Sequence, residues 1–159
     1  MTPREAAAAL IAAMPRGLSE FELQEYGIEA TAERAQAITR EILSLNLFWI
    51  FAAIEAHIPQ KFRPAVSELV LHAVETGWGT TYPVGPLAWT TFLTEWKERK
   101  ERYERMVRDG LSSLAISAEV GLLLEEQRVV GEDDRRNVLT LLIDSVPVET
   151  YGQLLQDIG

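Results

Sequence analysis

The chain of 159 residues carries a net charge of −9, with 24 acidic residues against 15 Lys and Arg, and it contains no Cys. The absence of Cys excludes disulfides, a thiolate nucleophile and Cys-type zinc sites, and it fits a reducing compartment. The negative charge disfavours binding to nucleic acid or to an anionic membrane surface. We therefore expect one cytoplasmic domain over residues 1–159, with no nucleic-acid partner and no membrane span.

Two capping boxes predict where the first helices begin. Thr2 precedes a Pro at the first helical position and a Glu three residues later, so we expect a helix from there to about Met14. Ser19 repeats the pattern with Glu22, and Gly27 suits the left-handed position that ends a helix. The sequence therefore predicts two short helices before residue 28.

A long helix is predicted from the cap at Thr31 to about His57, a length of about 40 Å. Its part from 42 to 58 is apolar nearly all round, but it is short and polar for a membrane span. The polar remainder is a narrow strip of three residues, Glu41, Ser44 and Glu55. Phe48 lies inside the strip and Phe51 beside it, which favours contact with another subunit. The simpler interpretation is a core helix wrapped by the N-terminal helices.

Asn46 and His57 are polar residues on the apolar side of this helix, about 20° apart around its axis. A buried Asn or His needs hydrogen-bond partners. One interpretation is a ligand-binding pocket near Asn46, His57 and Trp78, for a tetrapyrrole, a lipid or a metal. The simpler interpretation is that Asn46 is bonded internally, while His57 caps a carbonyl or meets solvent.

The next predicted helix runs from Arg63 to Gly77 and carries Glu68, His72 and Glu75 on one face. Their i, i+4 and i, i+7 spacings would allow a metal site. However, the apolar residues of this helix lie on its other side, and the inward Glu-x-x-His pair of di-metal bundles is missing. We therefore expect a solvated acidic face and no bound metal.

Residues 77–85 are rich in Gly and Pro and predict a loop, after which Pro86 is expected to open a helix to about Asp109. Three aromatic residues fall within twelve positions here, Trp78, Tyr82 and Trp89. Large rigid aromatics in a loop are typical of protein recognition, but they also form small cores that close a bundle. Both interpretations stay open. These three are candidate partner-binding residues, together with Phe48 and Phe51.

Residues 95–108 read EWKERKERYERMVR and predict a charged helix. Four Glu-to-Arg pairs have the favoured i, i+4 spacing: Glu95–Arg99, Glu98–Arg102, Glu101–Arg105 and Glu104–Arg108. The interleaved carboxylates argue against phosphate binding. A thin apolar stripe, interrupted by Lys100, consists of Leu93, Trp96, Tyr103 and Val107. We expect an exposed, ion-paired helix with one face on the bundle or on a partner.

The C-terminal part contains further helical segments. Gly110 is either a break or a kink, Leu111 to Val130 is predicted to be helical, another helix runs to Val146, and a weak segment follows Pro147. No window alternates for long enough to predict a strand. The expected fold is an all-α, single-domain bundle of about seven to eight helices around a long, nearly all-apolar central helix.

None of the common motifs for nucleotide binding, metalloprotease, serine-hydrolase or calcium-binding chemistry occurs. We therefore lean towards a protein that is not an enzyme and has no cofactor. The preferred hypothesis is a protein-interaction or self-associating protein, such as a homodimer, that uses helix 42–58 and loop 78–89. The alternative is a bundle that binds a small ligand or cofactor.

Overall fold

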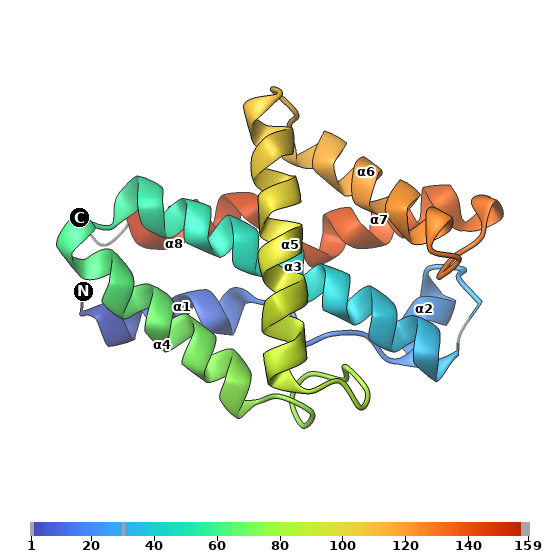
Figure 1. Ribbon diagram of the computed structural model, residues 1–159, viewed down its shortest axis with the longest axis horizontal. Coiled ribbons are helices and arrows are strands. Elements are labelled where there is room, and N and C mark those ends of the chain that lie inside the picture. Colours follow the sequence, from blue (N-terminus) through green and yellow to red (C-terminus); the bar gives the residue numbers. More distant parts are fainter. Residues whose placement is uncertain (1, 30, 157–159) are drawn as a thin grey trace.

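The computed structural model describes residues 2–29 and 31–156, and no β-strand is formed within these ranges. The α-helices in chain order are α1 (Pro3–Ala13), α2 (Glu20–Glu25), α3 (Ala32–His57), α4 (Arg63–Thr76), α5 (Trp89–Arg108), α6 (Ser113–Glu126), α7 (Arg135–Ser145) and α8 (Val148–Gln156). Two 3-10 turns, η1 (Gln60–Phe62) and η2 (Glu132–Asp134), precede α4 and α7. The predicted all-α helical bundle is confirmed (Figure 1).

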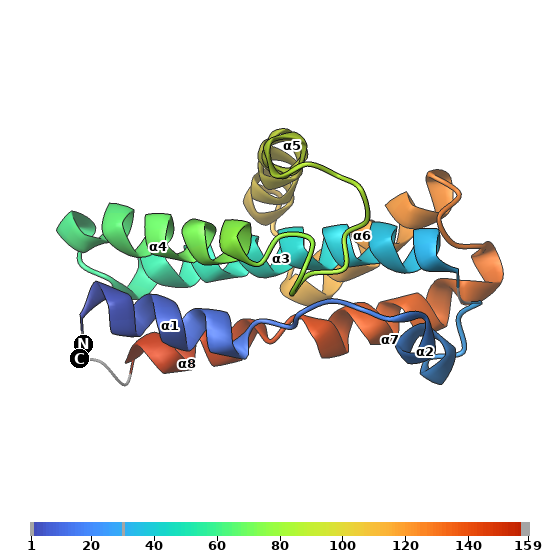
Figure 2. The same cartoon turned by 90° about the horizontal axis from the view of Figure 1, so that it is seen from below.

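The helices lie in layers around α3 (Figures 1 and 2). Helix α4 lies beside the C-terminal half of α3, while α1 and α8 lie beneath these two and contact them. Helices α6 and α7 pack together along the other half, where α2 also contacts α3. Helix α5 is the exception, because it crosses over the outer side of α3, away from α1, α7 and α8.

Helix α3 is the centre of the core, as its apolar character predicts. Six of its apolar side chains have no exposed surface: Ile38, Ile42, Leu43, Leu45, Leu47 and Ile50. The expectation that N-terminal helices wrap α3 is only partly right, because α8, α5 and α4 all pack against it. Most of the apolar surface of α3 is therefore covered within one chain.

By length and composition α3 would also pass as a membrane-spanning helix, the one candidate in the described part of the chain. However, 72% of the apolar window is buried inside the protein. A mostly buried apolar helix is typical of a core helix, so this observation is weak support for a membrane span.

Local signals place the helix starts near the N-terminus correctly. Thr2 and Thr31 cap α1 and α3 with their side-chain oxygens, and Ser19 and Glu22 form a complete capping box at α2. Gly27, at φ +75°, follows the C-cap of α2 in the left-handed conformation. These predictions are confirmed because each depends on residues within one turn of the helix end.

Two predicted boundaries are wrong. Helix α5 begins at Trp89, three residues after Pro86, because the Trp78 indole donates a 2.7 Å hydrogen bond to the Leu87 carbonyl and holds this stretch in the loop. Helix α6 ends before Val130, because Arg128 adopts a left-handed φ of +61° and closes the helix early. Gly110, at φ +87°, is a break between α5 and α6.

The four predicted ion pairs along α5 are also mostly absent. Of these four pairs, all of which lie in the described part of the chain, only Glu95–Arg99 is within ion-pair distance, at 3.4 Å. Lys100 instead approaches Glu104 at 3.9 Å, with the basic residue before the acidic one along the helix. Arg99 also binds a carboxylate on α3. Tertiary contacts and the alternative partner Lys100 thus replace the regular local pattern.

Candidate functional site

A buried polar network fixes α5 where it crosses α3. Arg99 donates from Nε to Glu41 Oε1 at 3.1 Å and from Nη1 to Ser44 Oγ at 3.3 Å. The Tyr103 hydroxyl donates to Glu41 Oε2 at 2.9 Å. Burial raises the pKa of Tyr103 well above its ordinary value, and the Glu41 charge adds to this effect, so the phenol stays protonated. Most of the predicted polar strip of α3 is therefore buried beneath α5.

Aromatic side chains surround this crossing towards the C-terminal half of α3. The ring of Phe48 packs edge-on against Tyr103, with centroids 5.4 Å apart, and against Trp49 at 5.0 Å. Phe51 packs against Trp96 with centroids 5.8 Å apart. Because α5 crosses α3 instead of running along it, these contacts cover only part of the aromatic surface. Trp49 and Phe51 remain half-buried.

Two adjoining hollows follow from this crossing, and together we call them the α3–α5 groove. The first measures about 530 Å³ and is lined by Phe48, Trp49, Phe51, Ala52, Glu55, Lys100, Glu104, Val107 and Arg108. The second measures about 440 Å³ and is lined by Phe51, Ile54, Glu55, Arg63, Ser67, Leu71, Leu93, Trp96, Lys97 and Lys100. Phe51, Glu55 and Lys100 border both hollows, so the two hollows adjoin between α3, α4 and α5.

The α3–α5 groove differs in charge from the chain as a whole. Four basic residues line it, Arg63, Lys97, Lys100 and Arg108, against two acidic ones, Glu55 and Glu104. The net charge of the chain is −9. An aromatic floor with a basic rim therefore lies on an acidic protein, and this combination favours an acidic, partly apolar ligand.

The structure separates the predicted partner-binding residues into two places. Phe48 and Phe51 line the α3–α5 groove. Trp78 instead packs against Trp89, with ring centroids 5.2 Å apart, and its indole nitrogen is bonded to the loop backbone. Tyr82 is only 4% exposed. The aromatic residues of the loop thus pack among themselves, against α5 and into the core, and none of the three lines the groove.

Asn46 lies in the core, where its amide makes three hydrogen bonds. Its Nδ2 donates to the Ile42 carbonyl at 2.8 Å and to the Ser145 carbonyl at 3.0 Å, and its Oδ1 accepts from the Tyr151 hydroxyl at 2.6 Å. Asn46 has no exposed surface. Its polar atoms therefore connect α3 with the end of α7 and with α8.

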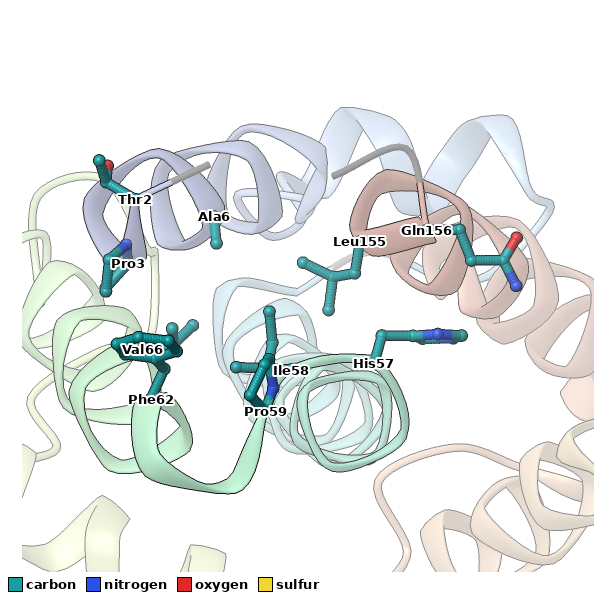
Figure 3. Close-up of a pocket in the computed structure, with 10 residues that line it drawn as sticks. All are labelled: Thr2, Pro3, Ala6, His57, Ile58, Pro59, Phe62, Val66, Leu155 and Gln156. Atoms are coloured by element: carbon teal, nitrogen blue, oxygen red, sulfur yellow. The ribbon is translucent and has the colours of Figure 1, made fainter. Parts of the chain in front are cut away.

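His57 lies apart from Asn46, at the exposed end of α3. It borders a cavity of about 470 Å³ between α1, α8 and the start of α4, whose other lining residues are Thr2, Pro3, Ala6, Ile58, Pro59, Phe62, Val66, Leu155 and Gln156. Figure 3 shows Ala6, Ile58 and Leu155 pointing towards one another, whereas the His57 ring lies to one side, towards α8. Asn46, His57 and Trp78 therefore do not line a common pocket.

Glu68, His72 and Glu75 are all exposed, as predicted for a solvated face. Among the residues that the structure describes, no group of three or more His, Asp or Glu side chains has the arrangement of a metal site. The acidic side chains of α4 thus face solvent.

Sequence reasoning did not single out several groove residues, above all Trp49 on α3 and Trp96 on the apolar stripe of α5. One signal was available, because Lys100 interrupts the apolar stripe of α5 at the position where the groove opens. Val107, the last residue of that stripe, is 45% exposed and also lines the groove. A cation inside an apolar stripe thus marks a surface that α5 does not bury fully.

Comparisons with protein-family models, with curated proteins and with solved structures find no match to this chain. The residues and their geometry therefore carry the functional argument.

Proposed function

We propose that this protein is a helical interaction protein that binds an acidic, amphipathic segment of another protein chain in the α3–α5 groove. The observation that supports this most directly is the half-covered aromatic surface of Trp49 and Phe51, bordered by Lys and Arg side chains. Aromatic residues and Arg are enriched where proteins bind each other, and amphipathic helices bind in grooves of this kind. The basic rim selects for carboxylates on the partner.

The test uses two synthetic peptides that share one apolar face, one with Glu and one with Lys on the polar face. Trp49 and Trp96 in the groove provide an intrinsic fluorescence signal for binding. The acidic peptide is expected to bind saturably and to bind more weakly as salt is added, because salt screens the basic rim. Equal binding of both peptides, or no binding of the acidic one, would contradict the proposal.

A matched pair of variants locates the binding surface. Ala52 is half-buried in the groove, so Ala52→Glu adds a bulky negative group there without removing a core side chain. We expect this variant to bind the acidic peptide at least about tenfold more weakly, which corresponds to 1.4 kcal/mol. Ala8→Glu, on the exposed side of α1, makes the same chemical change elsewhere. This control is expected to bind like the unchanged protein.

A second candidate function, binding of a small apolar ligand, is favoured by the 470 Å³ cavity in Figure 3. Its volume lies within the range of about 300–1,000 Å³ that small-molecule sites occupy. Its apolar lining fits a lipid or another hydrocarbon better than a charged cofactor. Native mass spectrometry tests this idea, because a co-purifying molecule lost on Ala6→Trp would support it. Purified protein without any bound molecule would count against it.

A further inference from the structure

The most exposed large hydrophobic side chain in the described part of the chain is Phe21 on α2, at 67% exposure. It does not belong to a disordered segment. Leu18 and Leu23 on either side are buried in the core, and the capping box of Ser19 holds the start of α2. The neighbouring side chains of Glu20, Glu22 and Glu25 are exposed. We call Phe21 with these three carboxylates the Phe21 surface.

The Phe21 surface and the α3–α5 groove are complementary in chemistry. The surface presents one projecting aromatic ring among three acidic side chains. The groove presents aromatic side chains, among them Trp49 and Phe51, below a rim with four basic residues and two acidic ones. An aromatic anchor that enters an apolar pocket, with opposite charges around it, is the usual composition of an interaction hot spot.

The two surfaces cannot meet within one molecule. Helix α2 lies at the N-terminal end of α3, whereas the groove follows its C-terminal half (Figure 1). In the view of Figure 2, α5 lies above α3 and α2 lies below it. A contact between them must therefore join two copies head to tail, each giving one surface and receiving the other.

We infer that the groove binds a second copy of this chain through its Phe21 surface, so that the protein self-associates head to tail. This inference rests on the proposed function of the groove and names its partner. A head-to-tail contact either closes into a ring or continues as a chain. Unless the ring contains only two copies, the average mass in solution therefore rises with concentration beyond the mass of a dimer.

The test compares sedimentation of the unchanged protein, of Phe21→Ser and of Ala52→Glu over a concentration series. Phe21→Ser removes the anchor from a surface position, and Ala52→Glu blocks the groove. Each variant alone is expected to stay monomeric, with the dissociation constant raised at least about tenfold. Mixed in equal amounts, they are expected to form a heterodimer, because the mixture retains one intact Phe21 surface and one open groove.

Controls and contrary results are equally specific. Leu114→Ser, a comparable change at a residue 56% exposed on α6 and outside both surfaces, is expected to leave self-association unchanged. Circular dichroism checks that each variant is folded. A monomeric unchanged protein, self-association insensitive to Phe21→Ser, or an equimolar mixture that stays monomeric would each overturn the inference. A symmetric groove-to-groove dimer would show the second of these results, because Phe21→Ser keeps an open groove.

The inference and the proposed function fail separately. If the acidic peptide binds to the groove while the protein stays monomeric at every concentration, the groove binds a different protein and the inference is wrong. If neither the peptide nor a second copy binds, both are wrong.

Discussion

The Tyr103 hydroxyl donates a 2.9 Å hydrogen bond to Oε2 of Glu41, a residue 62 positions earlier in the chain, and both side chains are buried. Tyr103→Phe removes the donor and keeps the ring in place against Phe48. We expect the free energy of unfolding to fall by about 1.5–3 kcal/mol, the range for a hydrogen bond to a charged group. Urea unfolding measures this loss.

A matched control is available in Tyr26→Phe, because the Tyr26 hydroxyl donates a 2.7 Å bond to Asp144 in an exposed position. Here water can replace the lost partner, so we expect a change within about 0.5 kcal/mol. Equal losses in the free energy of unfolding of the two variants would contradict the conclusion that burial of Glu41 makes the Tyr103 hydrogen bond the more stabilising one.

The ion pair between Glu41 and Arg99 allows a second prediction. Glu41→Leu leaves the largely buried Arg99 with two side-chain partners, the buried Ser44 and the more exposed Glu95. Removal of one partner from a buried pair costs about 3–5 kcal/mol. Replacing Arg99 by Met in the same chain is expected to restore much of this loss, because no unpaired charge remains. Thermal unfolding of both variants measures the difference. A double variant no more stable than Glu41→Leu would contradict this account.

These contacts show where sequence reasoning stops. The capping box of Ser19 and Glu22 was predictable, because both residues belong to one helical turn. Burial of Glu41 was not, since its cover comes from a helix far along the chain. The i, i+4 spacing likewise predicted four ion pairs in α5, but it could not show that Arg99 also binds a carboxylate on α3.

The candidate site was predictable to a similar degree. Aromatic residues beside the polar strip of α3 pointed to Phe48 and Phe51, and both line the groove. The groove itself depends on the direction in which α5 crosses α3, and no local pattern contains that direction. For the same reason the sequence left open whether Asn46 and His57 share a pocket, and the structure separates them, with Asn46 bonded internally and His57 exposed.

Asn46 carries a third prediction. Its amide satisfies the carbonyl of Ser145, the last residue of α7, and accepts from the Tyr151 hydroxyl. Asn46→Ala leaves both groups without this partner, at about 1–3 kcal/mol for each buried polar group left unpaired. We therefore expect a loss of at least about 2 kcal/mol in urea unfolding. Tyr151→Phe combined with Asn46→Ala is expected to cost less than the two single losses together, and strict additivity would count against a direct bond.

A fourth prediction concerns Arg128, whose φ of +61° is unfavourable for a residue with a side chain. The Val129 N–H donates to the Leu124 carbonyl at 2.9 Å, as in a Schellman motif, where the left-handed residue after the helix is usually Gly. Arg128→Gly is expected to raise the free energy of unfolding by about 0.5–1 kcal/mol, since Gly adopts this conformation without steric cost. Arg128→Ala, which loses the same charge, is expected to give no such gain. Thermal unfolding distinguishes the two variants.

The fifth prediction is alkaline unfolding coupled to two buried tyrosines. Burial raises the pKa of Tyr151 well above its ordinary value and has the same effect on Tyr103, where the Glu41 charge adds to it. An acid with a raised pKa in the folded protein supports folding fully below its unfolded pKa, which is about 10. This support is lost as the pH rises towards the folded pKa, because the unfolded chain already releases protons that the folded chain retains.

Phenolate absorbance and circular dichroism, followed together, should therefore show Tyr103 and Tyr151 ionising in the same step in which the helices are lost. In urea, all tyrosines should ionise near pH 10. Ionisation of these two residues while the helices remain intact would show that they are accessible to solvent, contrary to the structure.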